Sequence, residues 1–120
     1  MITTETILAT TTYGVPSGNY DGSSQDWFSD AVQAADYWRG RGSAQTVFFR
    51  VTDFQGTIKI TATLDTLPDT ADWFEIYNYT SGGSPLSDYH PVTLPGNFVW
   101  LRAEIQGFDG GTIDSVAVSY

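Results

Sequence analysis

The sequence contains no cysteine, so disulfides and thiolate metal sites play no part in this protein. The fold must therefore be held by packing, and a chain of 120 residues is long enough to bury a core. The absence of cysteine fits synthesis in a reducing cytoplasm, and a secreted domain without cysteine is also consistent with it. We expect a single domain over residues 1–120, because this length suits one domain and leaves no room for a second.

Basic residues are scarce, with five Lys and Arg against 14 Asp and Glu, and the formal net charge is −9. Nucleic acids and anionic membrane surfaces are bound by clustered positive charge, so we expect neither as a partner. The negative charge favours solubility by keeping copies apart. Two other uses remain open, which are a basic protein partner and Ca²⁺.

Long apolar runs and helical periodicity are also missing. No run is long enough for a signal peptide or a membrane span. No segment repeats its apolar residues every 3.6 positions over three turns. The chain is instead rich in Thr, Val, Ile and aromatic residues, and 12 Gly and five Pro divide it into short segments. This pattern predicts an all-β, antiparallel β-sandwich or jelly-roll-like fold.

Two pairs of alternating segments predict β-hairpins. The first pair is 45–54 and 57–64 around a turn at Gln55–Gly56, and the second is 97–106 and 112–120. Alternation in an antiparallel sheet places one face against the core. The aliphatic and aromatic positions of these faces are Val47, Phe49, Val51, Ile58, Ile60, Ala62, Leu64, Val99, Leu101, Ala103 and Ile105.

The start of the chain reads as a Thr-rich strand over 2–13, whose large aliphatic residues are Ile2, Ile7 and Leu8. We interpret residues 1–12 as either an N-terminal arm or an edge strand. Residues 27–38 fit a short helix as well as a strand, and we favour a strand.

Two later segments are also interpreted as β-structure. Residues 72–80 are predicted to form a strand. The stretch 86–95 contains Pro91 and Pro95, so it is expected to be irregular or an edge strand.

Residue patterns for catalysis are absent. The one histidine, His90, is expected in a proline-flanked loop, and no Gly-x-Ser-x-Gly elbow accompanies it. Glu75 and Glu104 are predicted to share one outer face, where a solvated pair is a simpler interpretation than a glycosidase site. We therefore expect no enzyme and no cofactor.

Two acidic loops have the oxygen-rich composition that Ca²⁺ prefers. They are residues 21–26 and the group Asp65, Asp69 and Asp72. The first lacks the spacing and the closing Glu of an EF-hand. Turn chemistry explains both loops, and no metal site is predicted.

Aromatic residues make up 15% of the chain and are the strongest candidates for a binding surface. Trp73 and Trp100 are predicted on faces opposite the main aliphatic residues. Such rings fit a second buried face, a subunit contact or sugar stacking. As partner-contact residues we nominate Trp73, Trp100 and Tyr79, together with Ile7 and Leu8 of the first strand.

Several segments carry a family resemblance when they are taken together. They are Tyr13–Ser24 (YGVPSGNYDGSS), Ala44–Val47 (AQTV), Gly56–Asp65 (GTIKITATLD), Asp72–Phe74 (DWF), Asn97–Arg102 (NFVWLR) and Gly111–Val116 (GTIDSV). The chain resembles small virion structural proteins of tailed phages, particularly the T4-like phages of marine cyanobacteria. The resemblance runs over most of the chain, and its motifs are strand and turn patterns.

The resemblance implies a β-sandwich protein that is made in the host cytoplasm and carried on the virion. It implies capsid decoration of the cement type, with a tail- or fibre-associated carbohydrate- or host-binding module as the alternative. The expected partners are the major capsid protein or other virion proteins, a glycan in the alternative, and further copies of the chain, with a trimer as the expected oligomer. No catalytic residue is carried over by the resemblance.

Overall fold

The computed structural model describes residues 4–34, 44–64, 73–81, 84–96 and 98–119. These residues form one eight-stranded antiparallel sheet without helix, so the all-β prediction is confirmed. No helix long and apolar enough to cross a bilayer occurs in these ranges. The strands are β1 (Thr4–Leu8), β2 (Thr11–Thr12), β3 (Trp27–Phe28), β4 (Val32–Gln33), β5 (Ala44–Thr63), β6 (Phe74–Thr80), β7 (Leu86–Pro95) and β8 (Trp100–Ser119).

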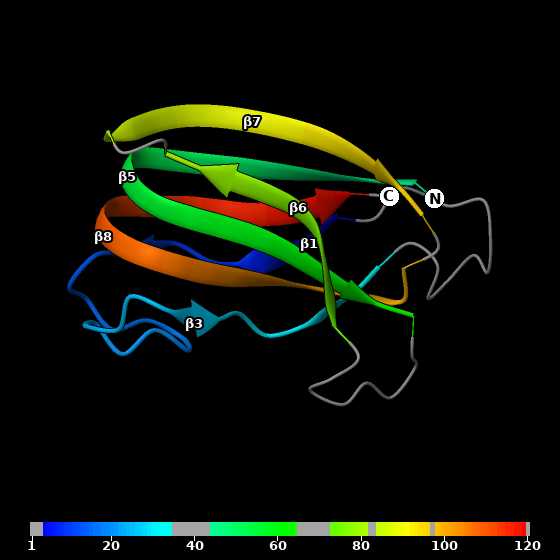
Figure 1. Cartoon of the computed structure of the whole chain (residues 1–120), viewed down its shortest axis with the longest axis horizontal. Coiled ribbons are helices and arrows are strands. Elements are labelled where there is room, and N and C mark those ends of the chain that lie inside the picture. Colours follow the sequence, from blue (N-terminus) through cyan, green and yellow to red (C-terminus); the bar gives the residue numbers. More distant parts are fainter. Residues whose placement is uncertain (1–3, 35–43, 65–72, 82–83, 97, 120) are drawn as a thin grey trace.

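Two strands of 20 residues each, β5 and β8, form the centre of the sheet. They pair antiparallel along nearly their whole length, from Thr46 opposite Ser119 to Thr63 opposite Trp100. Both strands turn back at the same end of the molecule, so their two halves lie in two layers (Figure 1). The sheet is therefore folded over on itself.

Each layer is completed by shorter strands that pair with one of the long strands. In the first layer, the first half of β5 pairs with β7, and the second half of β8 pairs with β1 and β2. In the second layer, the second half of β5 pairs with β6, and the first half of β8 pairs with β3 and β4. The layers thus share β5 and β8 and differ in their edge strands.

The two predicted hairpins are wrong. The two halves of β5 pair with β8 rather than with each other, and the two halves of β8 pair in the same way with β5. Gln55 lies inside β5 opposite Gly110, not in a tight turn. The alternation changes phase here, since the buried residues Val51 and Phe54 are three positions apart. Asp53, between them, has a positive φ of 50°, and the register shifts on both sides of Gln55. A bulged bend therefore stands where a turn was predicted.

The core lies between the two layers and is formed by the alternating residues of both long strands. Phe49 in the first layer stacks on Tyr79 of β6 in the second, with ring centroids 4.6 Å apart. The predicted inward positions are confirmed for all but Leu64, which lies beyond the end of β5 and is 62% exposed. The confirmed residues are Val47, Phe49, Val51, Ile58, Ile60, Ala62, Val99, Leu101, Ala103 and Ile105.

From Thr4 onward, where the structure describes it, the N-terminal segment forms an edge strand rather than a free arm. Within the described residues, β1 pairs only with β8, with Thr4 opposite Ser119 and Leu8 opposite Val116. Ile7 and Leu8 are buried in the core, at 4% and 8% exposure. Removal of residues 1–12 is therefore expected to open the core, because it takes two core side chains away.

Residues 86–95 form the edge strand that was one of the two predicted alternatives. Among the strands that the structure describes, β7 pairs only with β5, and Pro91 lies opposite Phe48. An edge tolerates proline because one side of the strand needs no donors. The loop predicted for His90 is wrong, since His90 belongs to this strand and lies opposite Phe49. Of residues 27–38, the described part, 27–34, contains β3 and β4 and no helix.

Candidate contact surface

The outer face of the second layer carries a row of charged and aromatic side chains. Its framework is the pairing of β5 with β8, which places Thr61 opposite Arg102 and Lys59 opposite Glu104. Cross-strand partners point to the same face of a sheet. Because Ile60 and Ala103 point into the core, these four residues point outward.

Arg102 lies between two aromatic rings on this face. Its guanidinium carbon is 4.3 Å from the ring centroid of Phe28 and 4.4 Å from that of Trp73. Phe28 comes from β3, next to β8, and Trp73 directly precedes β6, beyond β5. The stack therefore runs across the layer. We call Phe28, Trp73, Trp100 and Arg102 the contact surface.

The guanidinium of Arg102 is held by stacking rather than by hydrogen bonds. Its Nε atom is buried and has no hydrogen-bond partner within the part of the chain that the structure describes. Burial lowers the pKa of Arg102 below its ordinary value, and the nearby carboxylate of Glu104 opposes this shift. Thr61, opposite Arg102, is only 7% exposed although it points outward. The stack thus covers part of this face while remaining at the surface.

The contact surface is open to solvent at its aromatic residues. Phe28 is 44% exposed, and Trp73 and Trp100 are half-buried. Trp100 precedes Arg102 by two positions on the same strand and lies opposite Gln33 of β4. The two tryptophans predicted on an outer face therefore lie there.

Arg102 and Phe28 were not nominated from the sequence as contact residues. Alternation along residues 97–106 already placed Arg102 on the same face as Trp100. Phe28 gave no such indication, because β3 has only two residues and shows no periodicity. The stack itself depends on β3 and β6 lying on either side of the β5–β8 pair.

The other three nominated residues lie in the core and not on this surface. Ile7 and Leu8 of β1 are buried, and Tyr79 is 6% exposed. A register shift in β6 explains Tyr79. Ile60 pairs with Tyr77 but Thr61 pairs with Glu75, so Tyr77 and Tyr79 point inward while Glu75 points outward. Strict alternation along the strand would place all three on one face.

Tyr77 and Tyr79 join the edges of the two layers. The hydroxyl of Tyr77 is 2.8 Å from Nε2 of His90, and that of Tyr79 donates to Oδ2 of Asp88 at 3.1 Å. His90 and Asp88 belong to β7 in the first layer, whereas both tyrosines belong to β6 in the second. Burial, and then the hydrogen bond to Asp88, raises the pKa of Tyr79. We call these four residues the edge clasp.

Glu75 and Glu104 lie on one outer face, as predicted, but a lysine stands between them. Lys59 Nζ is 3.4 Å from Glu75 Oε1, and Lys59 also lies opposite Glu104. Glu104 accepts a hydrogen bond of 3.0 Å from the side chain of Gln106. β5 separates the two carboxylates, so their backbones are roughly 10 Å apart across two strand spacings.

The loop at Asp21 is organised by turn chemistry. Oδ1 of Asp21 accepts hydrogen bonds from the backbone N–H groups of Ser23 and Ser24, at 2.9 Å and 2.7 Å. Oδ2 accepts from the Ser24 hydroxyl at 2.7 Å. These donors lower the pKa of Asp21 to about 2. The described residues hold no group of three or more His, Cys, Asp or Glu suited to a metal ion, and Asp65, Asp69 and Asp72 lie outside them.

Comparisons with known proteins were made at three levels. No model of a protein family matches the chain. No similar curated protein and no similar solved structure was found.

Proposed function

We propose that the chain is a structural protein of a tailed-phage virion that decorates the capsid by non-covalent contacts. The segments that resemble virion proteins support this proposal. We also propose that the folded sheet is a β-sandwich of the jelly-roll-like kind, for which the two layers sharing β5 and β8 are the support. In this role the chain contacts the major capsid protein or other virion proteins and forms a homo-oligomer, with a trimer as the expected state.

The observation that carries the proposal is the stack of Arg102 between Phe28 and Trp73. Trp and Arg are enriched among the residues that dominate binding energy at protein interfaces. Stacking fixes the guanidinium before any partner arrives, so little side-chain entropy is lost on binding. A partner that covers this surface would bury the exposed part of Phe28 together with both tryptophans.

Decoration of this kind needs no chemistry beyond burial. A compact β-domain adds apolar contact at roughly 25 cal/mol per Å², before the costs of ordering and association. Repetition over a shell multiplies a modest gain per copy. The net charge of −9 keeps free copies apart until they bind.

The test is the binding of purified protein to particles that lack it. Arg102→Ala and Trp73→Ala are each expected to weaken binding at least about tenfold, which corresponds to the loss of one interface hot spot. Arg50→Ala is the matched control, because Arg50 stacks on one exposed ring, that of Tyr89, at 5.5 Å in the first layer.

Circular dichroism and thermal unfolding establish that each variant is folded before its binding is compared. If the folded Arg102→Ala and Trp73→Ala variants bind particles as well as the Arg50→Ala control does, the contact surface does not bind the particle.

The alternative is a carbohydrate-binding module on the tail or a fibre. The exposed ring of Phe28 and the half-buried rings of Trp73 and Trp100 favour it, since aromatic faces stack on sugars. This alternative predicts saturable glycan binding that Trp73→Ala and Trp100→Ala each abolish. If the folded protein binds no sugar on a glycan array, this alternative is contradicted.

A further inference from the structure

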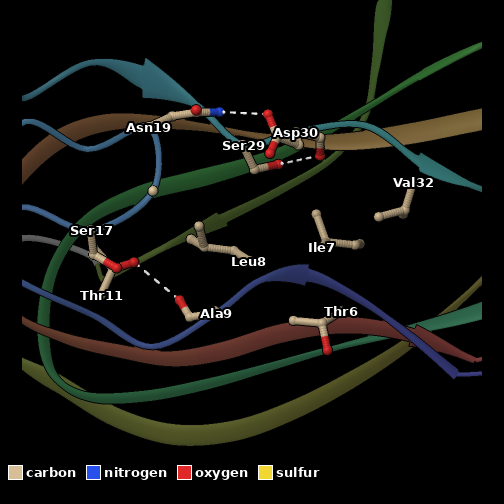
Figure 2. Close-up of a pocket in the computed structure, with 11 residues that line it drawn as sticks. Thr6, Ile7, Leu8, Ala9, Thr11, Ser17, Asn19, Ser29, Asp30 and Val32 are labelled. Atoms are coloured by element: carbon tan, nitrogen blue, oxygen red, sulfur yellow. Dashed lines mark hydrogen bonds between the residues drawn. The ribbon is translucent and has the colours of Figure 1, made fainter.

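The two open sides of the folded sheet differ. On one side, the edge clasp joins β6 to β7 through hydrogen bonds between their side chains. On the other side, β1 and β4 are the outermost of the described strands, and each pairs with β8 alone among them. A pocket lies between these two edges (Figure 2).

The pocket has an apolar floor and a polar rim. Ile7 and Leu8 of β1 are buried and form the floor with half-buried Val32 of β4. Asn19 and Asp30 are exposed and lie at its border (Figure 2). The volume is about 240 Å³, which would hold about eight water molecules at roughly 30 Å³ each. This space is sufficient for one side chain of a partner.

Asp30 is the only charged residue among the described residues that line the pocket. Nδ2 of Asn19 donates to Oδ1 of Asp30 and to the backbone oxygen of Phe28, both at 3.0 Å. These bonds fix the carboxylate at the rim and engage one of its two oxygens. An aliphatic floor beside a fixed carboxylate complements a side chain that has an alkyl stem and a cationic end.

We propose that this pocket receives a lysine side chain of a neighbouring protein. The methylene stem lies on Ile7, Leu8 and Val32, and the ammonium group pairs with the carboxylate of Asp30. The net charge of the chain, −9, attracts a basic segment to the molecule, and Asp30 supplies the negative charge at the pocket. That the neighbour is a virion protein rests on the proposed function, whereas the chemistry of the pocket does not.

The experiment is an NMR titration of the free, full-length protein with N-acetyl-lysine-N-methylamide. We expect saturable shifts of the methyl groups of Ile7, Leu8 and Val32 and of the side-chain amide of Asn19, with a Kd on the order of 10 mM. The norleucine analogue has the same stem without the ammonium group and is expected to bind more weakly.

Asp30→Asn keeps the size of the side chain and removes its charge, and should weaken lysine binding about two- to fivefold. Asp109→Asn is the matched control, because it removes an exposed carboxylate of β8 that does not line the pocket and should leave binding unchanged. Absence of shifts at the pocket up to about 50 mM probe overturns the proposal. Equal binding by the Asp30→Asn and Asp109→Asn variants also overturns it. The titration needs no particle, so a failure of virion attachment would leave its result intact.

Discussion

Arg102 is a partly buried cation that lies against two aromatic rings, whereas Arg50 lies against one. Arginine suits this position because its planar guanidinium stacks on both rings at once, which a lysine ammonium cannot do. The stack also explains why the exposed ring of Phe28 and the half-buried ring of Trp73, from separate segments of the chain, lie on either side of one residue. A single cation therefore organises the surface on which the proposed function rests.

Asp21 provides a test of the loop geometry at the level of one titrating group. Its folded pKa of about 2 lies below the ordinary value of 3.8, because Ser23 and Ser24 donate to the charged form. Its contribution to stability is therefore complete above pH 3.8 and is lost as the pH falls through about 2. Carbon-detected NMR titration of the carboxyl group measures this pKa.

The Ser24→Ala variant is expected to raise the pKa of Asp21, because it removes the hydroxyl donor at 2.7 Å. Ser23→Ala is the control, since that hydroxyl lies 3.4 Å from Oδ1. An Asp21 carboxyl that titrates at 3.8 in the unaltered protein would contradict the described turn.

Among the elements, the bends of β5 and β8 are the feature on which the two layers depend. Gly111 of β8 has a φ of +81°, and a Cβ there would lie 2.1 Å from the backbone oxygen of Asp53. Gly107 has a similar φ of +61°, but a Cβ there would meet nothing within 4 Å. Alanine at Gly107 therefore tests the cost of the positive φ alone. Alanine at Gly111 tests the same cost together with the contact between the backbones of β8 and β5.

Gly107→Ala is expected to lower the free energy of unfolding by about 1 kcal/mol, the cost of a left-handed alanine. Gly111→Ala adds a backbone clash and should cost about 3 kcal/mol or more. Urea unfolding measures both values. Equal losses for the two variants would mean that β5 and β8 do not approach each other as described at the bend.

The edge clasp gives a prediction at high pH. Burial and Asp88 raise the pKa of Tyr79 above its ordinary value of 10.0. A raised pKa contributes stability that is complete below pH 10.0 and is lost as the pH rises beyond it. Tyr79→Phe removes this titration, so its stability should fall less than that of the unaltered protein between neutral pH and about pH 11.

At neutral pH the same substitution should cost about 1–2 kcal/mol, because the hydrogen bond to Asp88 is lost. Tyr89→Phe is the control, since Tyr89 is 56% exposed. An alkaline loss of stability that is equally large in Tyr79→Phe would argue against a buried Tyr79 hydroxyl.

Alternation along the chain predicted which residues of β5 and β8 point inward, but not how these strands pair. The phase change near Asp53 and the glycines near Gly110 look the same for a hairpin and for a bent strand. The choice depends on β5 pairing with a strand about 50 residues later, which local periodicity does not report.

For the candidate site too, the sequence predicted which face some residues occupy but not which residues meet there. Trp100 lies on an outer face because its neighbours Val99 and Leu101 are buried. Tyr79 was misplaced because the register shift between Tyr77 and Glu75 depends on the partner strand and leaves no mark in the sequence. Arg102 meets Phe28 and Trp73 only because β3 and β6 lie on either side of the paired strands β5 and β8.

At the scale of the whole molecule, the described part of the chain offers two different surfaces. The contact surface lies on the outer face of the second layer, and the pocket lies between β1 and β4 at its open side. A protein that bridges neighbouring virion subunits needs two such surfaces, because one alone attaches it without linking anything. We therefore expect the two sites to contribute separately to particle binding.

The most direct test of the virion proposal is the copy number of this chain in purified particles, measured by quantitative mass spectrometry relative to the major capsid protein. A ratio near that of the capsid protein is predicted by capsid decoration. A ratio lower by about an order of magnitude or more would contradict decoration and favour the tail or fibre module, given how few copies such sites hold. Complete absence from the particle would contradict a virion role of either kind.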